Sequence, residues 1–365
     1  MSPSASQGIR VMLTGGGTGG HVTPNMALLP YLAREGWSVV YVGGVNGMEK
    51  GLIEPLGIPY YGIDSAPLDR YFTLTNLLIP FHVLRGIRQA GKLMKTLKPD
   101  IVFSKGGFVS VPVVFAAKRA GIPVVSHESD MTPGLANRLA IPKSRRVCVN
   151  FTETLEHLPE GKGVYTGTPI RDELLSGSRE RGLEISGLKD GKPILMVMGG
   201  SSGAQGLNAA VRKALPLLLP EFQVLHLCGK GNADRSLDGT EGYFQIEYAS
   251  EEMPHFYAAA DLMMCRAGAN SLAEILALAI PNVLVPLPLD ASRGDQILNA
   301  DSFRKKGYSC VLPQEEASPE RVLAAAREVF ANREAYTKAM KEAGETSGSE
   351  KVIEVLKEIL GSTAQ

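Results

Sequence analysis

Two glycine-rich segments, one in each half of the chain, most constrain what it can fold into. Residues 15–21 read GGGTGGH after an apolar run at 9–14, and residues 199–206 read GGSSGAQG after another at 194–198. A tight turn needs only one or two glycines. Glycine lets the backbone approach a ligand closely, and the N-terminus of a following helix presents unpaired N–H groups to an anion. The segments therefore predict a phosphate-rich ligand at loops that join a strand to a helix.

Short β-branched runs alternate with longer amphipathic stretches, a pattern typical of parallel α/β proteins. Helices are expected at 24–35, at 111–120, from about 207 and at 349–360. Two openings of strand, glycine loop and helix predict two doubly wound domains. The expected strands are 9–14, 37–42, 101–104, 123–126 and 146–149 in the first half, and 194–198, 223–227, 262–265 and 282–285 in the second.

Composition describes a globular chain. Of its 365 residues 44% are hydrophobic and 21% charged, with a mean hydropathy of +0.01. The four cysteines lie far apart, which excludes a CxxC zinc or redox motif. The balance of 38 basic and 38 acidic residues argues against bulk nucleic-acid binding. Residues 1–170 nevertheless hold 17 Lys and Arg against 11 Asp and Glu, a net of +6 that suits an anionic partner or membrane leaflet.

Several ligand classes are disfavoured by what the loops lack. A Rossmann site for a dinucleotide places an acid at the end of the second strand, but the run at 39–42 ends in Gly43 and Gly44. The P-loop pattern GxxxxGK[ST] is missing, and so is any Asp-x-Asp pair. We therefore expect no cofactor and no metal. Helix N-termini, loop amides and basic side chains would neutralise a leaving diphosphate.

A carboxylate suited to a ribose occurs in the second half. Glu274 lies early in the helix expected after the strand at 262–265, beside Gly268. There it could accept hydrogen bonds from both ribose hydroxyls. An acid near a helix N-terminus also complements the helix dipole, so both interpretations stay open.

The motifs occur together in one order: GGGTGGHVTP, SKGGFVSVP, HESDMTPGLAN, TGTPIRDELL, MGGSSGAQGLN, CRAGANSLAEI and GDQILNA. Over nearly the whole chain this set resembles glycosyltransferase family 28, and within it the inverting transferases that make lipid II from lipid I and UDP-GlcNAc for peptidoglycan. The resemblance implies the α/β GT-B fold, two doubly wound Rossmann-like domains facing a central cleft. It implies an acceptor and membrane-facing domain at 1–169, a UDP-GlcNAc domain at 170–345 and a helix at 346–365 that packs back on the first domain.

The resemblance also implies a set of site residues. His21 matches the histidine proposed as the base for the acceptor hydroxyl, and Glu128 beside His127 is a second candidate base or a carboxylate that holds loop amides. A neutral imidazole suits this role, although a neighbouring phosphate would raise its pKa. The residues matched to UDP-GlcNAc binding are Thr18, Gly19, Gly20, Asp130 (often asparagine in the family), Arg171, Ser201, Ala269, Asn270, Ser271, Leu272, Glu274 and Gln296. Those expected at the acceptor diphosphate are Gly16, Gly17, Gly106, Gly107 and Glu128.

The expected partners are UDP-GlcNAc, lipid I (undecaprenyl-diphosphate-linked muramoyl pentapeptide) and the inner leaflet of the cytoplasmic membrane, with no nucleic acid. No apolar run reaches the roughly 18 residues of a spanning helix and no signal core opens the chain, so we expect a peripheral protein on the cytoplasmic side. An apolar stripe at helical spacing is accompanied by basic residues. It has two interpretations, which both remain open: a core-facing helix that is broken or kinked at Pro80, or a membrane patch. The apolar residues are Leu74, Leu77, Leu78, Phe81, Leu84 and Ile87, and the basic residues among them are Arg70, Arg85, Arg88, Lys92 and Lys95.

Two other functions fit the same residues. One is a GT-B transferase acting on a different lipid, such as diacylglycerol. The other is a nucleotide-sugar-binding or epimerising protein with no transfer to lipid, for which the apolar and basic segment should be buried.

Overall fold

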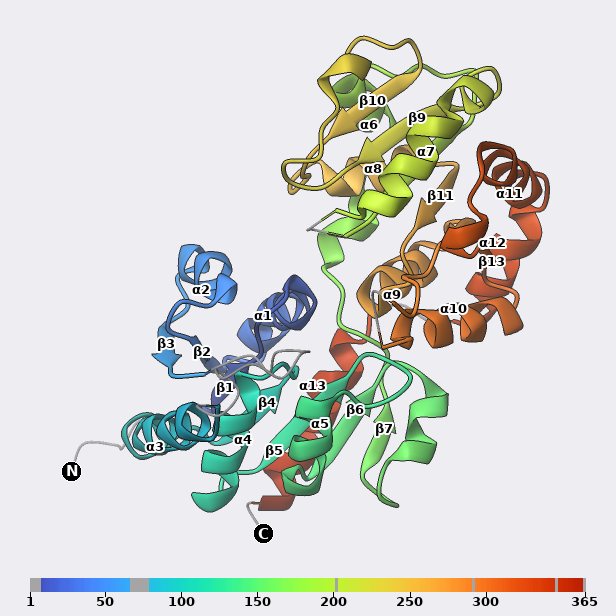
Figure 1. The fold of residues 1–365 in the computed structure, drawn as a ribbon. Helices are drawn as coiled ribbons and strands as arrows, with labels where there is room; N and C mark the ends of the chain where they lie inside the picture. The colour runs from blue at the N-terminus through green and yellow to red at the C-terminus, as the bar shows by residue number, and fades with distance from the viewer. Residues whose placement is uncertain (1–7, 66–78, 201–202, 291–292, 345–346, 364–365) are drawn as a thin grey trace. The chain divides into compact units, whose positions relative to one another are not determined.

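A computed structural model describes residues 8–65, 79–200, 203–290, 293–344 and 347–363. The chain forms two compact units, each with its own parallel sheet (Figure 1). Unit 1 comprises Met1–Arg171 and Ser347–Gln365, and unit 2 comprises Asp172–Thr346.

Unit 1 contains a seven-stranded sheet in the order β3-β2-β1-β4-β5-β6-β7, with every neighbouring pair parallel. The order reverses between β1 and β4, which is the topological switch point of a doubly wound fold. The strands are β1 Arg10–Thr14, β2 Ser38–Gly44, β3 Tyr60–Ile63, β4 Ile101–Ser104, β5 Val124–Glu128, β6 Arg146–Val149 and β7 Gly163–Tyr165.

Helices cover both faces of this sheet because its alternating side chains build two separate apolar layers. Leu13 and Phe103 point to the layer that contains α1 and α13, whereas Met12 and Val102 point to the layer of α3 and α4. Pro80 is the second residue of α3 as described, and the residues before Ile79 lie outside the described ranges, so the expected break or kink at Pro80 stays a prediction. The helices are α1 Thr23–Arg34, α2 Met48–Ile53, α3 Ile79–Leu97, α4 Ser110–Arg119, α5 Leu135–Ala140 and α13 Ser349–Thr363, with short 3-10 turns at Gly19–His21, Glu54–Leu56, Ile141–Lys143 and Thr152–His157.

Unit 2 repeats the topology with a six-stranded parallel sheet in the order β10-β9-β8-β11-β12-β13. Helices α7 and α11 contribute the apolar layer on one face. The strands are β8 Ile194–Met198, β9 Gln223–Leu227, β10 Tyr243–Ile246, β11 Leu262–Cys265, β12 Asn282–Leu284 and β13 Cys310–Val311. The helices are α6 Arg179–Ser186, α7 Gln205–Leu218, α8 Met253–Ala259, α9 Ala269–Leu278, α10 Asp295–Lys305, α11 Pro319–Ala331 and α12 Arg333–Glu342, with 3-10 turns at Asp172–Ser176, Arg235–Leu237 and Gln314–Glu316.

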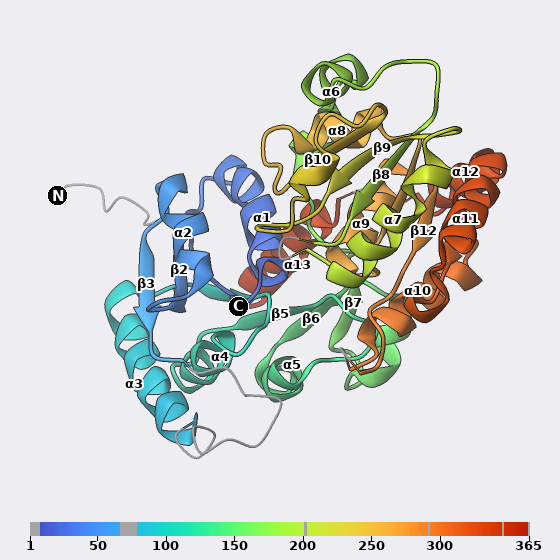
Figure 2. The same cartoon turned by 45° about the horizontal axis from the view of Figure 1, so that its top comes forward.

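The predicted α/β class with two doubly wound domains is confirmed, and every expected strand is present. The C-terminal helix α13 belongs to unit 1, where it packs beside α1 (Figure 2). Val352, Leu356 and Ile359 lie in the same apolar layer as β1 and β4. The chain enters this helix through Gly348, where a Cβ would lie 2.6 Å from the carbonyl carbon of Gly167, so a larger residue does not fit.

Leu356→Ala tests how much this docking contributes to unit 1. Leu356 is wholly buried, so its truncation should lower the free energy of unfolding by about 2–5 kcal/mol. Trp37, the chain's single tryptophan, packs against the same layer, and its fluorescence in a urea titration reports unit 1. Glu354→Ala, on the exposed face of α13, is the control and should stay within about 0.5 kcal/mol of wild type. An unchanged midpoint in Leu356→Ala would show that the docking is dispensable.

Candidate functional site

Each unit gathers its loop candidates at the carboxyl ends of the two strands that flank its switch point. In unit 1, Thr14 at the end of β1 pairs in register with Ser104 at the end of β4, so the loops starting at Gly15 and Lys105 are neighbours. In unit 2, Met198 pairs with Cys265, which makes the loop starting at Gly199 a neighbour of the one that leads into α9. Ligands of doubly wound folds bind at this position.

The two glycine loops of unit 1 pack backbone against backbone. Gly107 has a φ of +81°, and a Cβ there would lie 2.2 Å from the carbonyl oxygen of Gly16 and 3.2 Å from Nδ1 of His21. Gly17 has a φ of +85°, and a Cβ there would lie 2.5 Å from the ring of Phe108. The glycines therefore allow both loops to converge on His21, as their predicted role at an anion requires.

Glu49 holds the first loop from behind, and the sequence analysis missed it. This side chain of α2 is 1% exposed, and its carboxylate accepts hydrogen bonds from the backbone N–H groups of Gly44 (2.7 Å) and Gly17 (3.3 Å). A Cβ on Gly16 would lie 2.5 Å from the same carboxylate. The only signal for Glu49 in the sequence is that it is an acidic residue in the first turn of a helix, shortly after a pair of glycines.

His21 ends the 3-10 turn that follows the first loop. Thr18 Oγ1 lies 3.0 Å from its Nδ1, and the Gly16 carbonyl accepts a further hydrogen bond from the ring. Burial and the positive charge of Lys105 lower the pKa of His21 to about 4, against the opposing effect of the Gly16 contact. The imidazole is therefore neutral near pH 7, the form that a general base requires.

Glu128 closes β5 and anchors the loop that follows it. Its buried carboxylate accepts hydrogen bonds from the N–H groups of Asp130 (3.0 Å) and Gly134 (3.1 Å) and from Asn137 Nδ2 (2.8 Å). Burial, with the charge of Asp130, raises the pKa of Glu128. This geometry favours the loop-holding role over that of a base. Gly106 lies against Asn137, where a Cβ would be 3.1 Å from Oδ1.

The glycine loop of unit 2 is held by a neutral network. Ser201 lies outside the described residues, but a Cβ on Gly203 would lie 2.5 Å from the Cys228 carbonyl oxygen. Asn208 on α7 donates to that same carbonyl (2.7 Å), and its Oδ1 lies 3.0 Å from His226 Nε2. His226 Nδ1 is 2.9 Å from the Tyr243 hydroxyl. Burial lowers the pKa of His226 to about 3, with a smaller contribution from Arg212.

The predicted nucleoside segment begins α9. Glu274 lies in the second turn of this helix, where Tyr257 donates its hydroxyl hydrogen to Oε2 at 2.6 Å. The Leu272 side chain is wholly buried and its N–H bonds Gly268, so it packs the helix in place. Ala269 is also buried, while Asn270 and Ser271 are partly exposed in the first turn.

The remaining candidates occupy separate positions. Gln296, in the first turn of α10, accepts a hydrogen bond from the backbone N–H of Leu287 at 3.0 Å. Arg171 is the last residue of the first segment of unit 1. Arg266, at the end of β11, donates to the carbonyl oxygens of Val285 and Pro286 and to Gln314, so this buried cation ties together the ends of neighbouring strands.

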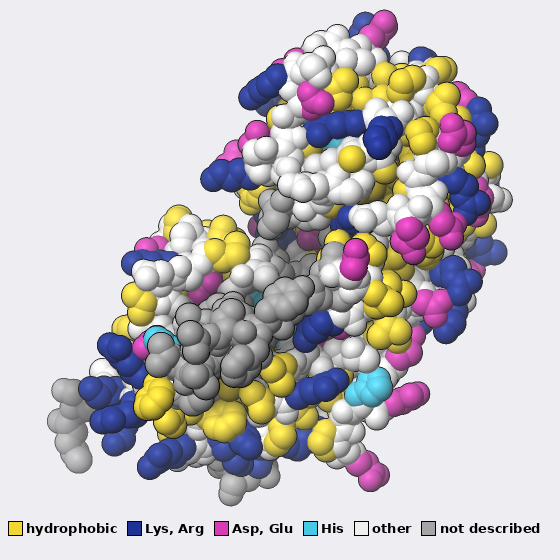
Figure 3. Space-filling model, in the orientation of Figure 1, with side chains coloured by type: hydrophobic (Ala, Val, Ile, Leu, Met, Phe, Trp, Pro, Cys, Tyr) yellow, Lys and Arg dark blue, Asp and Glu magenta, His cyan; other side chains and the backbone are white. Residues whose placement is uncertain are grey.

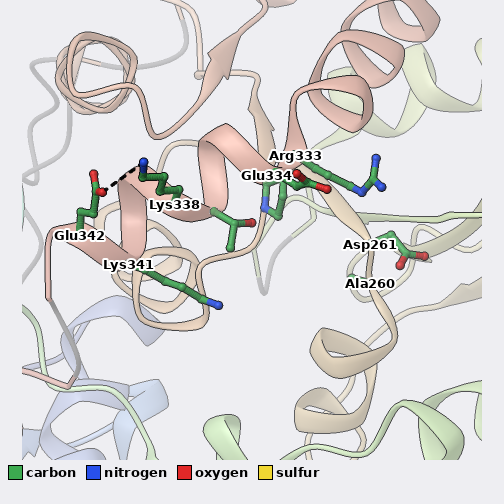
Figure 4. A pocket seen from close by; sticks show the side chains of 9 residues that line it. Ala260, Asp261, Arg333, Glu334, Lys338, Lys341 and Glu342 are labelled. Carbon is green, nitrogen blue, oxygen red and sulfur yellow. Dashed lines mark ion pairs between the residues drawn. The ribbon is translucent and has the colours of Figure 1, made fainter.

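A shallow cavity of about 630 Å³ lies elsewhere on unit 2 (Figure 4). Ala260, Asp261 and Pro281 come directly before β11 and β12, so the cavity lies at the amino ends of the strands, opposite the glycine loop. The other lining residues belong to α12. In the described part of the chain, no three His, Cys, Asp or Glu side chains cluster closely enough to hold a metal ion.

Comparisons with known proteins agree with this geometry. Residues 11–149 match the glycosyltransferase family 28 N-terminal domain, and residues 194–356 match the family 28 C-terminal domain. The chain belongs to glycosyltransferase family 28. Both switch points therefore carry the glycine loops of a family 28 transferase.

Relatives in this family match over nearly their full length. A UDP-N-acetylglucosamine--N-acetylmuramyl-(pentapeptide) pyrophosphoryl-undecaprenol N-acetylglucosamine transferase of Lachnospira eligens is 55% identical over 96% of this chain and 99% of its own. The protein of the same name from Clostridium tetani is 52% identical over 95% and 97%. The crystal structure of Acinetobacter baumannii MurG has a TM-score of 0.73 at 28% identity, covering 96% of this chain and 99% of that one.

The buried and neutral side chain of His226 should make the stability of this family 28 chain depend on pH. An unfolded histidine takes up a proton below about pH 6.5, whereas folded His226, with its pKa of about 3, stays neutral. The contribution of neutral His226 to the free energy of unfolding is fully present above pH 6.5. It is lost as the pH falls towards 3, by about 1.4 kcal/mol per pH unit.

His226→Gln should remove that part of the slope between pH 6.5 and 5, measured by denaturant unfolding followed by circular dichroism. Tyr243→Phe is the control because it removes a partner of His226 but keeps the imidazole, so it should lower stability and leave the slope intact. Equal slopes for wild type and His226→Gln would contradict the account.

Proposed function

We propose that this chain transfers N-acetylglucosamine from UDP-GlcNAc to the 4-hydroxyl of the muramoyl sugar of lipid I, which gives the lipid II used in peptidoglycan synthesis. It is a UDP-GlcNAc-dependent N-acetylglucosaminyltransferase, a hexosyltransferase of family 28. The observation that carries this is the 55% identity over 96% of the chain to the Lachnospira transferase of that substrate specificity. The loops at both switch points support the proposal, because they would present backbone N–H groups to the two diphosphates.

On the donor side, we assign UDP-GlcNAc to unit 2. The Gly199 loop and the N-terminus of α7 would present N–H groups to the diphosphate. Glu274 would accept hydrogen bonds from the ribose hydroxyls, in an orientation fixed by the Tyr257 hydroxyl. Being in the second turn of α9, it is also displaced from the unpaired N–H groups of that helix, which weakens the helix-dipole explanation.

On the acceptor side, His21 would take the proton of the attacking hydroxyl. The new bond forms between that oxygen and C1 of the sugar, while the bond from C1 to the diphosphate oxygen breaks with its electron pair leaving on UDP. The proton rests on the imidazole and is then released. The Gly16–Gly17 and Gly106–Gly107 loops would hold the acceptor diphosphate.

We also propose that one face of unit 1 rests on the inner leaflet. Phe81 and Leu84 on α3 are 70% and 60% exposed, and Leu135 and Leu139 on α5 are 48% and 45% exposed, which favours the membrane-patch interpretation over the core-facing one. Both helices start at the carboxyl edge of the sheet, the same edge as the acceptor loops.

Basic side chains accompany these residues (Figure 3). Exposed Arg85, Arg88, Lys92 and Lys95 continue along α3, and anionic lipids would attract them. Leu74, Leu77, Leu78 and Arg70 lie outside the described residues. Within the described ranges no helix is both long and apolar enough to cross a bilayer.

Release of UDP from UDP-GlcNAc, with and without a lipid I analogue and in the presence of EDTA, tests the reaction. We expect acceptor-dependent release and a product bearing GlcNAc on the muramoyl sugar.

His21→Ala should lose turnover and keep UDP-GlcNAc binding. Glu274→Ala should raise KM for UDP-GlcNAc about 10- to 100-fold, the usual cost of a hydrogen bond to a charged group. Glu334→Ala, at the opposite edge of the same unit, is the control. If the lipid I analogue did not stimulate UDP release, the assignment of lipid I as the acceptor would be refuted.

Sedimentation with vesicles tests the membrane face. Phe81→Ser combined with Leu84→Ser should weaken binding to phosphatidylglycerol-containing vesicles by about 10-fold or more, because two exposed apolar side chains are removed from the contact. Leu217→Ser, which changes an exposed leucine of unit 2, should bind as wild type does. Equal binding by the double variant would place the membrane contact elsewhere.

A further inference from the structure

A lysine behind the acceptor loops has no role in the reaction described so far. Lys105 directly follows β4 and is 1% exposed. Its backbone N–H donates to the Thr14 carbonyl (2.9 Å), and a Cβ on Gly15 would lie 3.1 Å from its own Cβ. The side chain is thus packed against the start of the first glycine loop. A buried lysine costs stability unless its charge is used or compensated.

The ammonium of Lys105 lies among charged groups from several elements. Nζ donates to Ser129 Oγ, directly after β5, and the carboxylates of Glu128 and Asp130 attract it. Glu128 already accepts three N–H hydrogen bonds, so it does not depend on Lys105 for its hydrogen bonding. Burial lowers the pKa of Lys105 to about 8, against the effect of these two acids, so the side chain is mostly charged at pH 7.

Lys105 and His21 lie on either side of Gly15, and the positive charge of Lys105 contributes to the lowered pKa of His21. The Lys105 loop continues into Gly107, whose backbone lies against His21 Nδ1, and Gly15 is enclosed between Lys105 Cβ and the His21 carbonyl oxygen. Buried His127 in β5 feels the same positive charge, and Glu49 holds the far side of the His21 loop.

We propose that Lys105 is a positioning residue whose buried ammonium keeps the His21 imidazole unprotonated while the anionic acceptor diphosphate is bound. The proposal rests on the proposed function, because it assigns Lys105 a part in that same acceptor site. A base beside a phosphate-binding loop needs such a positive charge, because the bound anion raises the pKa of the base.

An anion within about 4–6 Å raises the pKa of an imidazole by about one to three. From a value of about 4 in the free protein, the bound diphosphate would bring the pKa of His21 to between about 5 and 7, so that at least half of the imidazole stays neutral at pH 7. Burial would still lower the pKa of His21 without Lys105, but the starting value would be higher, and the bound diphosphate would leave a larger share of His21 protonated and unable to accept a proton.

Lys105→Met removes the charge and keeps the length of the side chain. In an imidazole NMR titration of histidine-labelled protein, with His21 identified by His21→Gln, we expect the His21 midpoint to rise by about one pH unit or more. Adding inorganic pyrophosphate should raise it further. Lys105→Arg keeps the charge and should hold the wild-type midpoint. Lys118→Met removes an exposed positive charge on α4 and serves as the matched control.

The kinetic counterpart is the pH profile of kcat/KM for the lipid I analogue. Lys105→Met should lose activity about tenfold at pH 6.5 and approach wild type at pH 8.5, where His21 is neutral in either protein. A merely structural role would lower activity equally at every pH. Should the methionine variant fail to fold, Lys105→Gln retains a hydrogen bond to Ser129 and replaces it.

An unmoved His21 midpoint, or a loss of activity independent of pH, would overturn the proposal. The NMR titration needs no turnover, so it separates this outcome from failure of the proposed reaction, which would appear as absent UDP release in the wild-type protein.

Discussion

The parallel pairing of β1 with β4 is the interaction on which the acceptor half depends. Because Thr14 and Ser104 stand in register, the glycine loops that leave these strands start side by side. Backbone then meets backbone where Gly107 lies against Gly16, an approach that no side chain would allow. The pairing of β8 with β11 does the same for unit 2. Two segments far apart in sequence are thereby brought together at one edge of the sheet by strand order alone.

The buried charges of unit 1 explain how such open loops keep one shape. Glu49 accepts N–H hydrogen bonds from two glycines, and Glu128 accepts two from the loop after β5 and one from Asn137 on α5. A buried carboxylate is unfavourable unless it is hydrogen-bonded, so each acid selects the loop conformation that supplies its donors. Lys105 lies beside Glu128 and balances part of this negative charge.

Local patterns were enough to predict the strands, the glycine loops and the doubly wound class, because a buried parallel strand and a strand–glycine–helix junction each have their own signature. The missed strands β3, β7, β10 and β13 lie at or near sheet edges, where short and partly exposed segments lack a continuous apolar run. The amphipathic face of α13 fits any apolar surface, so its local pattern could not place it, and only the family resemblance predicted that it packs on the first domain. Glu49 and Lys105 were missed because their partners come from segments distant in sequence.

The two units show how one topology supports two kinds of chemistry. Unit 2 fixes its glycine loop with neutral groups, since Asn208, His226 and Tyr243 satisfy one another without a formal charge. A loop that only neutralises a leaving diphosphate needs no more than backbone N–H groups and a stable support. In the proposed reaction unit 1 would also move a proton, and a proton acceptor responds to every charge nearby. The ionisable groups Glu49, Lys105 and Glu128 lie behind the loops of unit 1, at the switch point where we propose that the acceptor binds.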